Sequence, residues 1–406
     1  MFGKKQSIWP FILFIIGVII LFSFIFWSNG TFVRAPIDPL PGCVIVDSTG
    51  PSETNIDIVF LGTNYDSVGE FIDDTYFWKE ELLKVEPFNS NRDKFNFYRI
   101  ENFEDYGCEW DKGYILCNTG KIVRASSICP HDYFVVLTDI DGVYNLINWL
   151  RSSTYQKVMA INTADDPLVL AHEMGHAFGN FAEEYTEEGI SIWWDAPNCD
   201  SDMDSCSKFD SVDNTSCIAG CTNFEYSRSV KEGIMRDYWH RDGKTYGLFD
   251  EYILSELIYD ITSSSAKPEV PEDILLVDIE CESNNCTIIS VEESFGFPDG
   301  KEAHIEEGSS MRMESSGLGD EKTVVFFEPI EKMFTCFKTG KVTKIKDTIK
   351  TVIIPREETL KLTIHDANGK LISEYFFISN KEDIGAKDSS QIGVSGSKTV
   401  DIMAVS

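Results

Sequence analysis

The stretch that most constrains the fold runs from Asp165 to Asn180 and reads DDPLVLAHEMGHAFGN. Apolar side chains surround almost the whole circumference of a helix built from it, so the helix should be buried. Yet it carries two histidines and a glutamate, which need polar partners inside a protein. Asp166 can cap this helix with Pro167 at its first position. Gly179-Asn180 should end it, because both residues readily adopt the left-handed conformation.

The polar residues of this helix have the spacing of a metal site. His172 and His176 are four residues apart and therefore project from one face, about one turn from each other. Two neutral imidazoles in this arrangement can share one tetrahedral Zn2+ at about 2.0 to 2.1 Å. Glu173 lies about 100° round the helix from His172, where it can act on a zinc-activated water as general base and then acid. The sequence therefore predicts one catalytic zinc ion.

The third zinc ligand has several candidates. Ala182 stands where the metzincin-like motif HExxHxxGxxH places its last histidine. One inserted residue moves a carboxylate to Glu183, which we expect to be the ligand, with Glu184 as the alternative. The other of the two should make a supporting contact. A ligand from a second helix, Glu251 or Glu256 in FDEYILSELI, stays open.

A later segment, Gly233-Ile-Met-Arg-Asp-Tyr238, has the form of a Met-turn. In such a turn Met235 would form an apolar floor beneath the metal. Tyr238 and His240 are candidate donors to the oxyanion that develops on a substrate carbonyl. We therefore expect Tyr238 to take part in catalysis.

HEMGHAFGNFAEEY followed by GIMRDYW resembles the IgA-peptidase family of zinc metallopeptidases, whose motif is HExGHxxxxLxDEY with a later Met-turn. NIDIVFLGTNYDS and LLKVEPFNSNRDKFNFYRIE resemble the start of its catalytic domain, so the similarity covers residues 55–260. The resemblance implies a metzincin-like α/β fold, zinc, and endopeptidase activity on a protein or peptide substrate. Glu183 replaces the usual Asp, and Phe181 the usual Leu. The residues that match the motif are His172, Glu173, His176, Glu183, Glu184, Tyr185 and Met235.

Strand and helix patterns alternate over the first two thirds of the chain, which predicts an α/β domain with a mixed sheet and an active-site helix. Short strand-like runs separated by turn residues follow a polar linker that begins at Ser263, and they predict an Ig-like β-sandwich. Strands are expected at 54–62, 95–100, 133–137 and 157–161, and helices at 68–84 and 142–150.

The residues from Ile8 to Trp27 carry no charge, and Lys4 and Lys5 precede them. At about 1.5 Å per residue such a helix spans about 30 Å, one hydrocarbon core, and no small-x-small cleavage site follows. The positive-inside rule then keeps the N-terminus in the cytoplasm and places the catalytic domain outside the cell. The sequence thus predicts a single transmembrane signal anchor. The expected divisions are a cytoplasmic tail 1–7, a transmembrane helix 8–27, a linker 28–53, a metallopeptidase domain 54–262, a sandwich 263–380 and a flexible tail 381–406.

Charge and cysteine content narrow the function further. With 35 basic and 67 acidic residues the chain has a formal charge of −32, which argues against a nucleic-acid partner. Eleven cysteines are typical of an oxidising compartment. The spacings C-x6-C from Cys199 to Cys206 and C-x10-C from Cys206 to Cys217 are longer than the C-x2-4-C pairs that structural zinc prefers, so disulfides are expected among these residues and Cys221. Their odd number leaves at least one cysteine unpaired or bridging two chains.

Two functions are compatible with these features. The first is a membrane-anchored extracellular zinc endopeptidase that hydrolyses peptide bonds through a metal-activated water, with Glu173 as base and acid. The alternative is a catalytically silent cell-surface adhesion or scaffold protein with a metalloprotease-like domain. The intact HExxH motif favours the enzyme, because an inactive relative could lose Glu173 without penalty.

Overall fold

The computed structural model describes residues 40–111, 113–140, 150–186, 195–239, 244–263, 270–282 and 285–297, and beyond these only the strands named below. The chain separates into two compact units, Met1–Ile37 and Asp38–Ser406. Every described residue belongs to the second unit.

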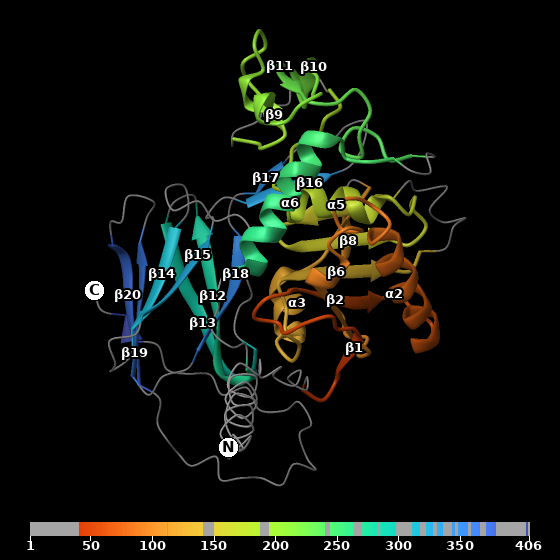
Figure 1. The fold of residues 1–406 in the computed structure, drawn as a ribbon. Helices are drawn as coiled ribbons and strands as arrows, with labels where there is room; N and C mark the ends of the chain where they lie inside the picture. Colours follow the sequence, from red (N-terminus) through yellow and green to blue (C-terminus); the bar gives the residue numbers. More distant parts are fainter. Residues whose placement is uncertain are drawn as a thin grey trace, which may run out of the picture. The chain divides into compact units, whose positions relative to one another are not determined.

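A mixed eight-stranded sheet organises the first part of this unit (Figure 1). Four parallel strands form its centre, and burial on both faces explains why β6 and β8 are almost entirely apolar, whereas β2 and β3 also bury polar residues such as Asp57 and Asn96. They are the four strands expected from the sequence, which are confirmed: β3 (Phe95–Ile100), β2 (Ile56–Thr63), β6 (Tyr133–Thr138) and β8 (Val158–Asn162). Antiparallel strands flank them: β1 (Cys43–Asp47) beside β3, and β7 (Ser153–Tyr155), β16 (Glu331–Thr335) and β17 (Thr343–Ile345) beyond β8.

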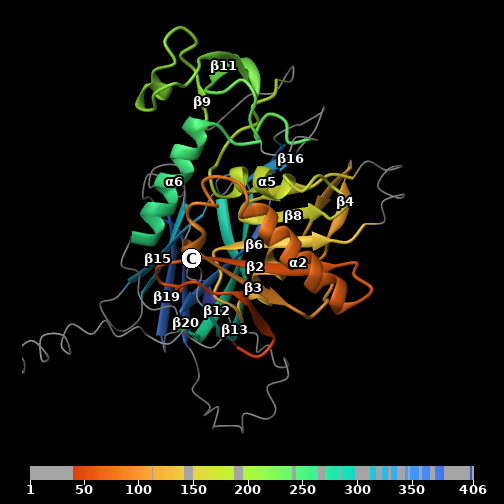
Figure 2. The same cartoon turned by 45° about the vertical axis from the view of Figure 1, so that its right-hand side comes forward.

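Each face of the central strands buries its own core, because successive side chains of a strand point to opposite faces. Ile58 and Phe60 of β2 pack with residues of three helices, α2 (Val68–Leu82), α5 (Val169–Ala177) and α6 (Leu248–Ser263). Val59 and Leu61 pack on the other side with α3 (Thr119–Ser126). Figure 2 shows α2 lying across the strands of the sheet. Helix α5, in which every residue but Ala177 is buried, is therefore enclosed on one face of the sheet.

Helix α2 matches the helix expected at 68–84 and shows why the sequence folds locally. The Ser67 hydroxyl accepts a hydrogen bond from the backbone N–H of Glu70 at 3.2 Å, which caps the first turn. Phe71, Trp78 and Leu82 recur at helical spacing and form its buried stripe. The helix expected at 142–150 lies almost wholly outside the described residues.

Several shorter elements and five disulfides accompany the main sheet in the described part of the chain. Two single 3-10 turns, Arg92–Lys94 and Ser207–Ser211, and two small sheets complete the first part. The sheets consist of β4 (Glu109–Asp111) with β5 (Tyr114–Leu116), and of β9 (Cys199–Asp200), β10 (Ile218–Cys221) and β11 (Asn223–Arg228). The expected disulfides are confirmed, and the described pairs are Cys43–Cys129, Cys108–Cys117, Cys199–Cys221, Cys206–Cys217 and Cys281–Cys286. Cys336, the eleventh, lies outside the described residues.

Two antiparallel sheets follow α6, where the sequence predicts a sandwich. One contains β13 (Asn285–Gly296), β12 (Glu272–Glu282) and β18 (Thr348–Pro355), and the other β15 (Lys322–Phe327), β14 (Met311–Ser316), β19 (Thr359–His365), β20 (Leu371–Ile378) and β21 (Met403–Ala404). Val277 of β12 and Ile364 of β19 belong to one core, so the two sheets share it. Strands β16 and β17 lie between β15 and β18 in the sequence, but they extend the first sheet, because β16 pairs with β7. The domain boundaries remain predictions.

The prediction of a membrane-spanning helix needs correction. Among the described residues no helix is both long and apolar enough to cross a bilayer. The longest described helix, α6, has 16 residues and includes Asp250 and Glu251 in its first turn. It is shorter than the roughly 20 apolar residues that a span requires. The stretch 8–27 itself lies outside the described residues, so the single-pass localisation inferred from it is withdrawn.

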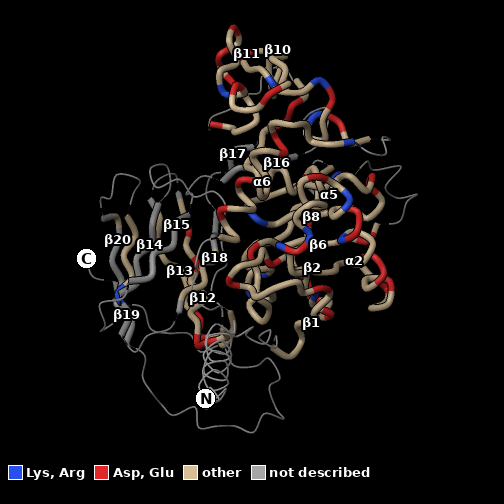
Figure 3. Tube along the Cα trace, viewed as in Figure 1, with Lys and Arg blue, Asp and Glu red and all other residues tan. Residues whose placement is uncertain are grey.

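The acidic character of the chain is spread over the described elements. Figure 3 shows Asp and Glu along helix α2 and in the loops, with Lys and Arg interspersed among them. Within the described part, basic residues do not gather on one element.

Candidate metal centre

Helix α5 begins and ends close to the expected positions. Asp166 caps the turn that leads into the helix rather than the helix itself, since its Oδ1 accepts from Leu168 N at 3.0 Å. At the other end Asn180 has φ 52°, the left-handed conformation expected there. Phe181 N then donates to Gly175 O at 3.1 Å, which turns the chain back along the helix. This reversal brings the residues after 180 under the two histidines.

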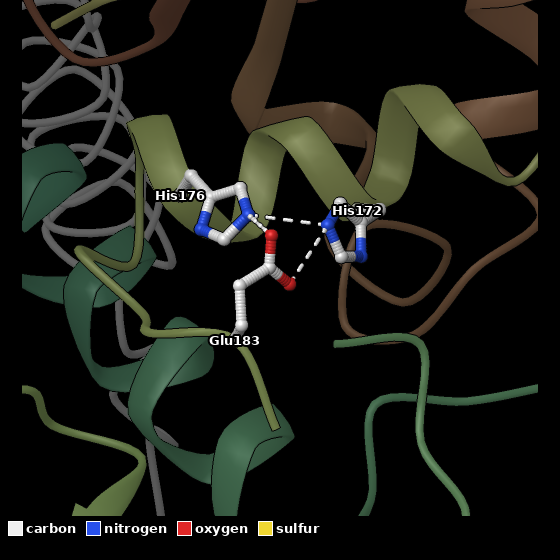
Figure 4. A group of neighbouring side chains, drawn as sticks. All are labelled: His172, His176 and Glu183. Carbon is white, nitrogen blue, oxygen red and sulfur yellow. Dashed lines mark hydrogen bonds and ion pairs between the residues drawn. The ribbon is translucent and has the colours of Figure 1, made fainter. Parts of the chain in front are cut away.

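His172, His176 and Glu183 meet at the point where the chain returns (Figure 4). The two Nε2 atoms are 3.1 Å apart. Glu183 Oε1 lies 3.2 Å from Nε2 of His176, and Oε2 lies 3.4 Å from Nε2 of His172. All three side chains are buried, with exposed fractions of 1%, 2% and 2%.

The other nitrogen of each ring fixes its tautomer. Nδ1 of His172 lies 2.9 Å from Ile234 O, and Nδ1 of His176 lies 2.8 Å from Phe181 O. A carbonyl oxygen only accepts, so both Nδ1 atoms carry the hydrogen, and in the neutral rings both Nε2 atoms present lone pairs. Two lone pairs cannot hydrogen-bond to each other. The geometry therefore requires a proton or a cation between them.

The distances fit a tetrahedral ion. Two ligands that each lie about 2.0 to 2.1 Å from one tetrahedral Zn2+ are roughly 3.3 Å apart. The separations of 3.1, 3.2 and 3.4 Å lie close to that value, the last two measured to different oxygens of the Glu183 carboxylate. Nitrogen and carboxylate oxygen donors also suit zinc chemically. The residues present thus fit a zinc ion.

Without a metal, the Glu183 carboxylate stabilises the protonated form of His172, and the histidines stabilise the ionised form of Glu183. Burial alone would lower the pKa of His172, but Glu183 and the nearby Glu173 raise it to about 9. Burial would likewise raise the pKa of Glu183, but His172 and His176 lower it to about 2. The metal-free site therefore keeps a proton at neutral pH.

Adjacent residues Glu183 and Glu184 have separate environments. The carbonyl of Glu183 accepts from Thr222, from the backbone at 2.7 Å and from the hydroxyl at 2.9 Å. Glu184 N donates to Met235 O at 3.1 Å. These bonds fix the backbone so that the Glu183 carboxylate faces the histidines, whereas that of Glu184 lies near Asp250. The sequence had left this choice open.

The alternative ligands on α6 do not join the three side chains. Glu251 is half-buried and accepts from Gly247 N at 3.4 Å, at the start of its own helix. Glu256 is exposed. Within the described residues, the group that could hold a metal consists of His172, His176 and Glu183.

Glu173 is completely buried beside this group. The hydroxyl of Thr154, on β7, donates to its Oε2 at 2.6 Å. This bond fixes the orientation of the buried Glu173 carboxylate. Thr154 escaped the sequence analysis, since it lies 19 residues before Glu173 in a strand of three residues with no motif of its own.

Met235, for which the sequence predicts a place beneath the metal, lies against the helix that carries the two histidines. Met235 is fully buried and packs against Gly175, which lies between the two histidines on α5. A Cβ added at Gly175 would overlap Met235 Sδ and lie 3.1 Å from Tyr246 Cε1. Tyr246, a second residue missed from the sequence, donates its hydroxyl hydrogen to Ala171 O. Glycine is thus required at position 175 by close approach.

Tyr238 lies beside the metal group, with its ring centroid 4.9 Å from that of His172. Its exposed fraction is 4%. This contact limits the motion of the His172 ring, and a role of the Tyr238 hydroxyl in catalysis remains a prediction. His240, the other candidate donor, lies outside the described residues.

Comparison with known proteins does not identify the chain. No family model matches it, and no curated protein matches it.

Proposed function

We propose that this chain is a zinc-dependent metalloendopeptidase. The observation that supports this most strongly is the convergence of two imidazole Nε2 atoms and one buried carboxylate, while backbone carbonyls accept the hydrogens of both Nδ1 atoms. A buried glutamate that is not part of that group stands next to it. The sequence motifs that resemble the IgA-peptidase family support the same function.

The roles of the side chains follow from their contacts. His172, His176 and Glu183 would hold the zinc ion, and the carbonyls of Ile234 and Phe181 keep both rings oriented for it. Zinc bound there supplies an acidified water and polarises a substrate carbonyl. Glu173 takes the proton of the attacking water and returns it to the leaving nitrogen. Thr154 holds the Glu173 carboxylate in place for both transfers.

The proposal is tested by separating metal binding from cleavage. The Glu173→Gln variant should bind one zinc per chain, because Glu173 is not among the proposed ligands, but should not cleave an unfolded protein or a peptide library. Zinc is measured by elemental analysis and cleavage by mass spectrometry of the products. Glu256→Gln is the matched control, since it changes an exposed glutamate and should keep both properties.

Two outcomes would contradict the proposal. Undiminished cleavage by Glu173→Gln would show that Glu173 does not transfer the proton. Zinc in the wild-type protein without hydrolysis of any peptide in a broad library would favour the adhesion or scaffold function instead.

A further inference from the structure

A second cluster of buried oxygen atoms lies next to the proposed zinc site in sequence but outside it in space. Glu184 and Asp250 both have an exposed fraction of 0%, and Ser229 has 4%. Among the described residues, no donor meets any of the four carboxylate oxygens in hydrogen-bonding geometry, and the Ser229 hydroxyl also has no partner. The three residues come from separate segments: the chain after α5, the chain after β11, and the first turn of α6.

These groups face one another. The carboxyl groups of Glu184 and Asp250 are within hydrogen-bonding reach of each other, and the Ser229 hydroxyl is close to the carboxyl group of Asp250. Asn198 is the other polar neighbour of Glu184; its amide oxygen accepts from Ala182 N at 2.8 Å and one amide hydrogen goes to Ala182 O at 2.9 Å, which leaves one hydrogen for Glu184. Five oxygen atoms therefore converge, and when both acids are ionised they carry a single hydrogen, that of the Ser229 hydroxyl.

The nearby cations do not satisfy these carboxylates. The guanidinium group of Arg228 donates to the carbonyls of Ala219, Gly220 and Val230. Arg236 donates to the Lys231 carbonyl and to Glu232. Both arginines thus influence the cluster only from a distance. Two buried carboxylates left in this state would be strongly destabilising.

One shared proton would resolve only part of this problem. It would neutralise one carboxylate and form one hydrogen bond, and the remaining oxygens would stay unsatisfied. A bound cation can accept all of them as ligands. The absence of a side chain at Gly233 leaves room beside the cluster, since a Cβ there would lie 3.2 Å from Glu184 Oε2 and 2.8 Å from Tyr246 O. That carbonyl borders the same space.

The donor set selects the kind of cation. Carboxylate, hydroxyl and carbonyl oxygens are the ligands of hard cations, and Ca2+ accepts six to eight of them in flexible geometry. The cluster contains neither imidazole nor thiolate, in contrast to the proposed zinc site. We propose that Glu184, Asp250 and Ser229 form a calcium site that ties the segment carrying Glu183 to helix α6.

Direct binding to the wild-type protein tests this without any substitution. Zinc-loaded protein is dialysed against radioactive calcium in 150 mM NaCl and 1 mM Mg2+, conditions chosen as about physiological so that exposed acidic residues are screened. We expect one calcium per chain, bound saturably, and a melting temperature that rises with calcium concentration. Wild-type protein that binds no calcium under these conditions would overturn the proposal.

Substitution locates the site. Asp250→Asn should lose the bound calcium and the rise in melting temperature. Glu251→Gln is the matched control, because it removes the neighbouring acid, whose carboxylate accepts from Gly247 N, and it should respond to calcium as the wild type does. Equal calcium binding by Asp250→Asn and the wild type would place the ion elsewhere and overturn the assignment. If Asp250→Asn does not fold, the wild-type stoichiometry still decides whether a calcium site exists. Calcium binding to the Glu184→Gln variant then decides its place: loss of the ion supports the cluster, and full retention overturns it.

Discussion

Zinc binding should be strongly pH-dependent because the metal must displace a proton that the site itself retains. With a pKa of about 9, His172 is protonated at neutral pH in the metal-free protein. Zinc requires the neutral ring. Each pH unit below 9 should therefore weaken zinc binding tenfold, which amounts to about 100-fold at pH 7, or about 2.7 kcal/mol.

The assay is calorimetric titration of zinc into the metal-free protein in two buffers with different ionisation enthalpies. The Glu183→Gln variant is the control, because it removes the carboxylate that raises the pKa of His172. Burial then favours the neutral ring, so the wild type should release about one more proton per zinc than the variant at pH 6 to 7. A proton released by water on the metal would contribute equally to both proteins, so the comparison between them removes it. Equal proton release by both proteins, or a wild-type affinity that does not change between pH 6 and 8, would refute the reasoning.

The same charges predict how the stability of the metal-free protein depends on pH. The raised pKa of His172 contributes stability that is fully present below about pH 6.5, the unfolded value, and is lost as the pH rises through about 9. The lowered pKa of Glu183 contributes stability that is present above about pH 4.5 and lost as the pH falls through about 2. Both contributions are complete only between about pH 4.5 and 6.5. Melting temperatures of the metal-free protein should be highest in that window relative to Glu183→Gln.

Two substitutions test the residues that support the site. Thr154→Val removes a hydrogen bond to the Glu173 carboxylate worth about 1.5 to 3 kcal/mol, so kcat should fall about 10- to 150-fold at unchanged zinc content, whereas Thr154→Ser should keep most of the activity. An unchanged kcat in the valine variant would show that the bond does not orient the base. Gly175→Ala adds a methyl group that overlaps Met235, a strain of about 1 to 3 kcal/mol that exceeds the gain of up to about 1 kcal/mol in helix propensity. Gly69→Ala, where the nearest atom is 3.9 Å away, should not lower the melting temperature; a Gly175→Ala protein that melts as high as Gly69→Ala would contradict the close packing.

The sequence by itself determined the elements whose pattern is local. The four central strands are mostly apolar and are separated by turn or helix patterns, so their positions could be predicted within one or two residues. The two histidines share a face of α5 because four residues make about one helical turn, whatever the surrounding fold. The left-handed conformation of Asn180 also follows from its residue type.

Only the tertiary structure decided which neighbours these residues meet. Neighbouring residues of an extended chain point in different directions. Which of Glu183 and Glu184 faces the histidines therefore depended on backbone hydrogen bonds with Thr222 and Met235, far along the chain. No local pattern could pair Thr154 with Glu173 or Asp250 with Glu184, because those contacts arise when separate segments pack together. A spacing rule describes one helix or strand, whereas the meeting of Glu183 with the two histidines, the bond of Thr154 to Glu173 and the second oxygen cluster exist only where several elements converge.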